Sequence, residues 1–220
     1  MASLKELRQH LELLQNLGIK ELYKYQSDHA RLLAEKEREH STCQLCSLAE
    51  GRIKFVYGSG NPEAIAMIIG EAPGEQENLM GKPFVGKAGE LLDKMLAAIA
   101  LTREEIYIAN IVKCRPPGNR NPESNERLAC LPYLMEQIAI IKPKLFLFMG
   151  LVAAQTLLGT TQSMGILRQS VHEFEGIPAY VTYHPAALLR NPDWKRPAWE
   201  DLQEFQKHYL KLLEPCDETP

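Results

Sequence analysis

Short apolar runs alternate with amphipathic stretches over most of the chain, and this alternation predicts the fold class. Four runs have the length of β-strands: 65–69, 106–112, 144–149 and 179–183. The first three are predominantly apolar, as strands buried on both faces of a sheet are. Between the runs, apolar residues recur at helical spacing. This order predicts an α/β domain whose parallel sheet is covered on both faces and binds ligands at the carboxyl ends of its strands.

The two ends of the chain carry a different pattern. Residues 3–6 form a capping-box motif, and a second helical stretch over about 20–39 ends in a run of charges. Leucines follow the motif at helical spacing: Leu4, Leu7, Leu11 and Leu14. We interpret both stretches as a solvated helical arm without chemistry. The prediction is a helical extension over 1–40, a single domain over 41–215 and a tail over 216–220.

Composition narrows the class of protein. Hydrophobic residues make up 45% of the 220 residues and charged residues 24%, which excludes disordered and fibrous chains. The net charge of −3 does not indicate nucleic acid as a partner, so any DNA-binding surface must be a local basic patch. No apolar run approaches about 18 residues, and the N-terminus lacks a signal-peptide pattern. We therefore expect a cytoplasmic protein without a membrane partner, and nothing identifies a protein partner.

Four cysteines are candidates for a metal site. Cys43 and Cys46 form a CxxC pair, and fifteen residues separate Cys114 from Cys130. A CxxC pair alone fits a redox pair or half of a zinc site. Four cysteines with one tight pair favour a metal site over separate buried thiols, and both zinc and an iron–sulfur cluster suit four thiolates. We interpret Cys216, in the polar tail, as a free thiol.

A glycine-rich loop follows the first predicted strand. It covers 70–77 and continues through 81–89 into a helix. Glycines allow the backbone to approach a ligand closely, and a phosphate could sit at the helix N-terminus. The spacing matches neither the Walker loop nor the dinucleotide fingerprint. Two acidic residues near the loop would repel a phosphate and suit a site that handles water or a developing positive charge.

Taken together, these segments resemble the iron–sulfur (type 4) uracil-DNA glycosylases. The resemblance runs from about Cys43 to Tyr209, includes the four cysteines in the family's order, and rests on four motifs: 70–74, 81–86, 110–120 and 184–190. It implies a four-stranded parallel sheet with flanking helices in three α/β/α layers. It also implies base excision repair: removal of uracil from single- and double-stranded DNA by hydrolysis, which leaves an abasic site. The implied cofactor is a [4Fe–4S] cluster on Cys43, Cys46, Cys114 and Cys130.

Within this family reading, four residues take roles in a flipped-base mechanism, because uracil inside a duplex is out of reach. Phe84 stacks on the extruded base, and the amide of Asn110 reads the N3–H and O4 of uracil. Glu71 orients water and counters the cationic sugar. His184 donates a hydrogen bond to O2 as charge builds there.

Further residues are expected to select the base and bind DNA. The backbone from Ala72 to Gly74, or Glu77, excludes the methyl group of thymine. Two loops are expected to contact DNA, with one leucine as a wedge and cations on phosphates. Their candidates are Lys113, Arg115 and Arg120 in the first loop, and Leu188 or Leu189, Arg190, Lys195 and Arg196 in or after the second. The cysteines bracket the first loop, so the cluster is expected mainly to hold it in place.

Two departures from the family pattern matter. The chain has Glu77-Asn78 where Glu-Asp is frequent, and it has no histidine between Lys113 and Cys130, where a branch that captures DNA covalently carries one. We therefore expect turnover. Two alternatives remain: a non-catalytic DNA-binding module of a replication or repair complex, and a zinc-bound α/β nucleotide-binding protein.

Overall fold

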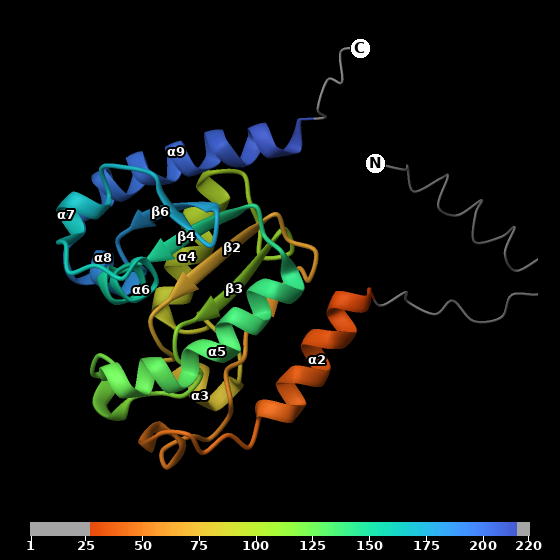
Figure 1. Ribbon diagram of the computed structural model, residues 1–220. Helices are drawn as coiled ribbons and strands as arrows, with labels where there is room; N and C mark the ends of the chain where they lie inside the picture. The colour runs from red at the N-terminus through yellow and green to blue at the C-terminus, as the bar shows by residue number, and fades with distance from the viewer. Residues whose placement is uncertain (1–26, 215–220) are drawn as a thin grey trace, which may run out of the picture.

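Four parallel strands form the centre of the sheet in the computed structural model, which describes residues 27–214. They are β2 (Ala66–Gly70), β3 (Ile106–Asn110), β4 (Leu145–Met149) and β6 (Ile177–Thr182), in the order β3-β2-β4-β6. Every residue of β2, β3 and β4 is buried, as their apolar runs predict. The four carboxyl ends lie at one edge of the sheet, where the arrowheads point in Figure 1.

The whole sheet is mixed and has six strands, so the expectation of a four-stranded parallel sheet is correct only for its centre. The edge strand β1 (Ser59–Gly60) pairs antiparallel with β3, and β5 (His172–Phe174) pairs antiparallel with β6. Both are too short to give a periodic pattern. The β5–β6 hairpin turns at Glu175 and Gly176, whose φ angles are 52° and 74°, as a tight primed turn requires.

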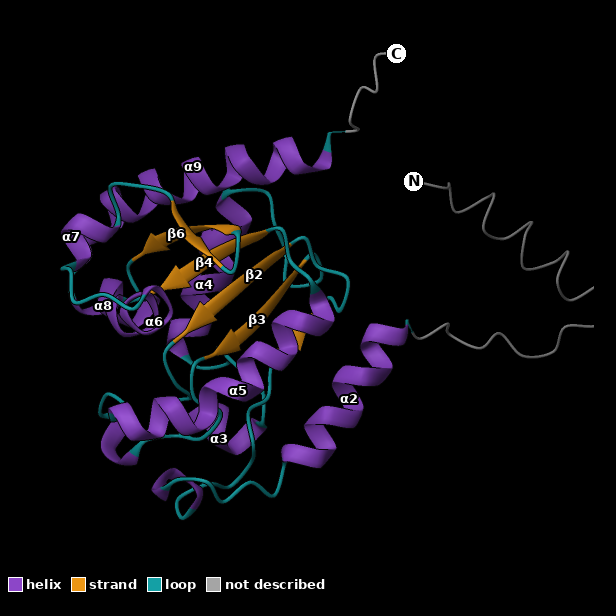
Figure 2. Cartoon of the chain, in the orientation of Figure 1, coloured by secondary structure: helices purple, strands orange, loops and turns teal. Residues whose placement is uncertain are grey.

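Helices cover both faces of the sheet (Figure 2). One face packs against α5 (Ser124–Ile141) and α6 (Leu151–Leu158). The other packs against α4 (Lys87–Ala98), α8 (Pro185–Arg190) and α9 (Lys195–Leu213). Shorter helical segments complete the chain: α3 (Glu75–Met80), α7 (Met164–Leu167), η1 (Ser47–Ala49), η2 (Pro117–Asn119) and η3 (Pro192–Trp194).

Alternation along β2 explains the two cores. Met67 and Ile69 belong to the core beneath α5, whereas Ala66 and Ile68 belong to the core beneath α4 and α9. Successive strand residues point to opposite faces, so an apolar strand fills both cores at once. Each large side chain buried in this way contributes about 1.5–3 kcal/mol. The result is a rigid sheet whose strand ends can hold a site.

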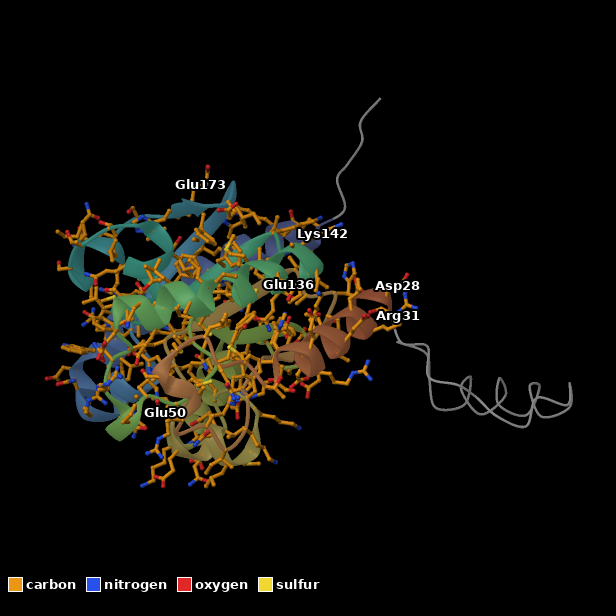
Figure 3. All side chains as sticks on the ribbon, turned by 60° about the horizontal axis from the view of Figure 1, so that its bottom comes forward. Asp28, Arg31, Glu50, Glu136, Lys142 and Glu173 are labelled. Carbon is orange, nitrogen blue, oxygen red and sulfur yellow. The ribbon has the colours of Figure 1, made fainter. Side chains whose placement is uncertain are left out.

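The helix α2 (Asp28–His40) lies beside α5 and is attached to it (Figure 1). Leu33 is its one buried residue, and Lys36 and His40 pair with Glu136 of α5 at 3.1 and 2.6 Å. Figure 3 labels Glu136 at this junction. The helix is mostly exposed, as its charges predict, yet it is docked on the domain. The leucine-spaced stretch predicted before it, and Cys216, lie outside the described residues.

No helix between residues 27 and 214 is long and apolar enough to span a membrane.

Candidate active site

One cavity of about 550 Å³ opens at the carboxyl edge of the sheet, and the four residues expected to act on the flipped base all line it. Glu71 follows β2, Asn110 ends β3, and His184 follows β6. Phe84 reaches the cavity from the loop between α3 and α4. The sequence expectation that these four residues share a single site is therefore met by their positions.

Asn110 presents an unsatisfied acceptor to this cavity. The residue is 2% exposed, and its Oδ1 has no hydrogen-bond partner within the described chain. A buried polar atom without a partner costs about 1–3 kcal/mol, so such atoms usually await a ligand or water. The ammonium group of Lys113 donates to the main-chain oxygen of Asn110 at 2.9 Å and holds the residue from behind.

His184 is held as a hydrogen-bond donor. Its Nδ1 accepts from the N–H of Ala186 at 3.1 Å, so the neutral ring carries its proton on Nε2. Burial, assisted by the nearby Arg190 cation, lowers the pKa of His184 to about 4. The ring stacks on Phe84, with 5.3 Å between ring centroids. At neutral pH the imidazole is uncharged and can donate from Nε2.

The pKa of Glu71 is shifted in the opposite direction. Burial raises the pKa of its carboxyl to about 7, and the Arg127 cation opposes this only in part. A carboxyl that titrates near pH 7 can accept a proton from water under physiological conditions. Perturbed groups of this kind, gathered in a cavity, indicate a catalytic site.

Phe84 adopts a left-handed backbone conformation, with φ at 53°. This region is costly for a bulky residue, so the surroundings must impose it. The Arg103 guanidinium donates to the carbonyl oxygens of Phe84 and Pro83. Gly89 permits the same turn, because a Cβ there would lie 1.8 Å from the Phe84 oxygen.

Gly70 lets the side chains of Asn110 and Phe84 approach each other. A Cβ at this position would lie 2.5 Å from Oδ1 of Asn110 and 2.7 Å from the ring of Phe84. Any larger residue would displace one of them. The last position of β2 therefore needs glycine for a reason of space.

Glu77 lines the cavity, but its oxygens are engaged by the loop. They accept the N–H groups of Gly74, Val85 and Gly86 at 3.1, 2.8 and 2.8 Å. The carboxylate joins the segment after β2 to the segment before α4. Its position suits the shaping of the cavity wall.

Asn78, where the family often has aspartate, lies away from the cavity. Its Oδ1 accepts from the N–H of Ile53 at 2.9 Å, and its Nδ2 donates to the oxygen of Gly51 at 3.3 Å. An aspartate could not make the second bond. The departure from the family pattern at this position therefore concerns the loop before β1.

The four cysteines line a second, small cavity. Cys43 and Cys46 lie between α2 and η1, Cys114 follows β3, and Cys130 lies in α5. Their sulfurs accept three N–H groups: Leu45 N–H to Cys43, Lys113 N–H to Cys130 and the Arg52 guanidinium to Cys114. Burial raises the pKa of the Cys130 thiol to about 12 and also raises that of Cys114. Within residues 27–214, no three His, Cys, Asp or Glu side chains are grouped to hold a single metal ion.

Two of the residues expected to contact DNA are in the wrong place for that role. Lys113 is fully buried, and its ammonium group binds Asn110 and Gln137, so it cannot reach a phosphate. Leu188 is 2% exposed, because α8 turns it toward the core beneath α4. Leu189, the next residue, is 47% exposed and therefore remains the candidate for the wedge.

Three of the remaining basic candidates, all arginines, lie near the cavity. Arg120 and Arg190 line it, and Arg115 donates to Asn119 within the same loop. Arg120 also forms a bidentate ion pair with Glu126, at 2.7 and 2.8 Å. This pair lowers the pKa of the Glu126 carboxyl to about 2. A contact with DNA remains a prediction for all three arginines.

Sequence reasoning missed several residues around the site. Tyr183 and Trp194 line the cavity, and Arg103 supports it from outside. The position of Trp194 before two cations, Lys195 and Arg196, was a usable signal, because exposed aromatic residues beside basic ones are typical of nucleic-acid contacts. No local pattern marks Arg103, whose partner lies 19 residues away.

Comparisons with known proteins find uracil-DNA glycosylases. A family profile described as the Uracil DNA glycosylase superfamily matches residues 57–203. A type-4 uracil-DNA glycosylase from Saccharolobus solfataricus is 40% identical over 192 residues, which cover 82% of this chain and 86% of the relative. One from Thermotoga maritima is 38% identical, over 77% of this chain and 90% of the relative. A type-5 uracil-DNA glycosylase from Pyrobaculum aerophilum is 29% identical, over 60% and 66%.

Proposed function

The chain belongs to the uracil-DNA glycosylase superfamily, and on that basis we propose that it excises uracil from DNA. The extruded nucleotide enters the cavity at the strand ends, and hydrolysis of the N-glycosidic bond leaves an abasic site. The observation that carries the proposal is the buried, unpaired Oδ1 of Asn110, which shares one cavity with Phe84 and His184.

Asn110 selects the base. Its Oδ1 accepts the N3–H of uracil, and its Nδ2 donates to O4. Cytosine presents the reverse pattern at these two positions and would leave both amide groups buried without partners, which gives strong discrimination. Phe84 borders the same cavity and offers a stacking surface to the base.

Glu71 and His184 serve the cleavage. As the bond between C1′ and N1 breaks, negative charge develops on uracil, and Nε2–H of His184 donates to O2. Glu71 orients a water molecule, accepts its proton as the water oxygen bonds to C1′, and stabilises the cationic sugar. A neutral histidine and a carboxyl with a pKa of about 7 suit these two tasks.

Thymine is excluded by the cavity wall. Ala72, Pro73 and Gly74 line the cavity, and Glu77 accepts the N–H of Gly74. We assign the exclusion of the C5 methyl to this backbone segment, with Glu77 as the residue that holds it in place. A rigid wall of backbone rejects an added methyl group better than a mobile side chain does.

A [4Fe–4S] cluster on Cys43, Cys46, Cys114 and Cys130 completes the protein. Four thiols from three segments line one cavity, and three of the sulfurs accept N–H groups, which is the donor chemistry such clusters use. When bound, the cluster supplies a covalent anchor for the loop over residues 113–120. Zinc is the competing occupant of four thiolates, and metal analysis separates the two.

Single- or double-stranded DNA binds across the mouth of this cavity. Arg115, Arg120 and Arg190 contact phosphates, and Leu189 fills the space that the extruded base leaves. Phosphate contacts are independent of sequence, so these residues suit an enzyme that scans all DNA.

The test is an excision assay on oligonucleotides that contain uracil, thymine or hypoxanthine, followed by alkaline cleavage of abasic sites. Metal-loaded protein is expected to cleave the uracil strand and to leave the thymine strand intact. Binding of the uracil strand without any abasic product would overturn the proposal and favour a non-catalytic DNA-binding module. Zinc without iron in the purified protein would overturn the cluster assignment.

A further inference from the structure

An exposed indole borders the catalytic cavity and has no part in the mechanism above. Trp194 ends η3, lines the cavity and is 39% exposed. One face of its ring stacks on Tyr183, with 4.8 Å between centroids and 21° between planes. An indole that packs on one side and borders a cavity has surface left for a second flat partner.

The stack beneath Trp194 is anchored in the core. The Arg168 guanidinium lies over the Tyr183 ring, 5.0 Å from its centroid. Arg168 in turn binds both carboxylate oxygens of Asp201 at 2.8 and 2.7 Å, and Thr182 donates to Asp201 at 2.7 Å. The guanidinium and the indole therefore both pack on the Tyr183 ring, and Asp201 of α9 and Thr182 of β6 hold the guanidinium in place. Such a support limits the motion of the indole and lowers the entropy lost when it binds a partner.

The cations near Trp194 indicate which partner fits. Arg190 lines the same cavity, and Lys195 follows Trp194 directly with an exposed side chain. A flat aromatic face with cations nearby is the arrangement that binds a nucleobase and its flanking phosphates.

We propose that Trp194 is a stacking platform for the nucleobase next to the extruded uracil. Stacking on that neighbour holds the strand open beside the lesion and accepts any of the four bases, because each has a π-face. The position of the neighbour relative to uracil rests on the proposed function, whereas stacking on unpaired DNA does not.

Fluorescence isolates the platform, because the chain contains only two tryptophans. Trp199 of α9 is also 39% exposed but does not line the cavity, which makes it a matched control. In Trp199→Phe, emission from Trp194 should be quenched by a thymine-only single strand of about 15 nucleotides. In Trp194→Phe, emission from Trp199 should stay unchanged. Equal quenching in both variants, or none in either, would overturn the proposal even if uracil excision is confirmed.

The affinity for a uracil-containing strand tests directly whether Trp194 stacks on the base next to uracil. The probe is a single strand with one 2′-fluorinated deoxyuridine, whose glycosidic bond resists hydrolysis. Trp194→Leu should bind it about 5- to 150-fold more weakly, with an unchanged dependence on salt. Trp194→Phe should recover part of the loss, and Trp199→Leu should stay within about twofold of the wild type.

A second set of oligonucleotides distinguishes the loss of stacking from a structural effect of the substitution. An abasic analogue replaces the base on one side of the uracil or on the other. One of the two replacements should weaken the wild type to the level of Trp194→Leu and leave Trp194→Leu unchanged. If Trp194→Leu lowers the affinity by the same factor for every strand, the effect of the substitution is structural and the proposal is wrong. If the excision assay on ordinary uracil-containing strands gives no abasic product, yet the quenching of Trp194 persists, the proposed function fails and the stacking site stands.

Discussion

Two side chains of the cavity have their protonation set by burial more than by charged neighbours. Burial raises the pKa of Glu71 to about 7 and lowers that of His184 to about 4. In both cases a low-polarity surrounding disfavours the charged form. Near neutral pH the site therefore contains a donor that carries no charge and a carboxyl close to its titration midpoint.

Excision should depend on pH through Glu71. Since the ionised carboxylate accepts the proton from water, kcat/KM should fall about tenfold per pH unit below pH 7 and level off above it. His184 stays neutral throughout and adds no inflection between about pH 5 and about pH 9. Single-turnover rates across this range measure the profile. Glu71→Gln should be slow and independent of pH, and a flat wild-type profile would contradict the role of Glu71.

The same carboxyl should cost stability at high pH. Its folded-state pKa lies above the ordinary 4.5, so its favourable contribution is full below about pH 4.5 and is lost as pH rises through about 7. Glu71→Gln should therefore raise the free energy of unfolding at pH 8 by about 1–3 kcal/mol and have little effect near pH 4. Urea denaturation at both pH values measures this, with exposed Glu90→Gln as the control. An equal effect at both pH values would rule out the linkage.

Base selection should depend on the amide of Asn110. Asn110→Asp replaces the Nδ2 donor with an oxygen that cannot bind O4, and it places a carboxylate in a buried position. Uracil excision should fall by about 100-fold or more, on the scale of an unpaired buried group. Excision from uracil and cytosine strands measures rate and base choice together. Asn125→Asp, on the exposed start of α5, is the control, and unchanged activity in Asn110→Asp would remove the recognition role.

At the scale of elements, the sequence predicts best those strands in which every residue is buried. The central strands are buried on both faces, so their apolar runs marked them to within one or two residues. The second run was predicted too long because Ile111 and Val112 are also buried, although they lie in the loop after β3. The convergence of Glu71, Asn110 and His184 followed from the common edge of parallel strands.

Long-range contacts of charged residues could not be predicted in this way. Lys113 lies in a motif rich in cations, and charge normally indicates solvent. Its burial depends on Gln137, which also donates to the Tyr57 carbonyl and the Tyr107 hydroxyl. Nothing in the local sequence of Lys113 indicates this polar network on α5, which only the packing of the helix on the sheet creates.

The loop that carries Phe84 should depend on Arg103 in the same long-range way. Arg103→Ala removes the donors to the Phe84 and Pro83 carbonyls that hold the left-handed turn. We expect kcat/KM for uracil excision to fall about 10- to 100-fold, because strained geometry persists only when its surroundings impose it. Asp93→Asn breaks only the exposed ion pair of Arg103 and should have a small effect. Equal losses in the two variants would contradict the carbonyl clamp.

At the scale of the whole molecule, the cysteines bring three separate parts of the chain to one place. They come from the segment after α2, the loop after β3 and the middle of α5. Cys130 also accepts the N–H of Lys113, whose ammonium group holds the main chain of Asn110. The four-cysteine cavity and Asn110 are thus linked through a single residue, Lys113.

This connection makes the loss of one ligand measurable in three ways. Cys130→Ser should abolish bound iron, lower Tm by several degrees and speed proteolysis of the loop over residues 113–120, since the anchor of that loop is gone. Affinity for single-stranded DNA should fall with it, because Arg115 and Arg120 lie on the same loop. Cys216→Ser is the same substitution outside the proposed ligand set and should keep its iron, Tm and affinity. A Cys130→Ser protein that lacks iron but keeps the Tm, protease resistance and affinity of the wild type would show that the cluster does not position the loop.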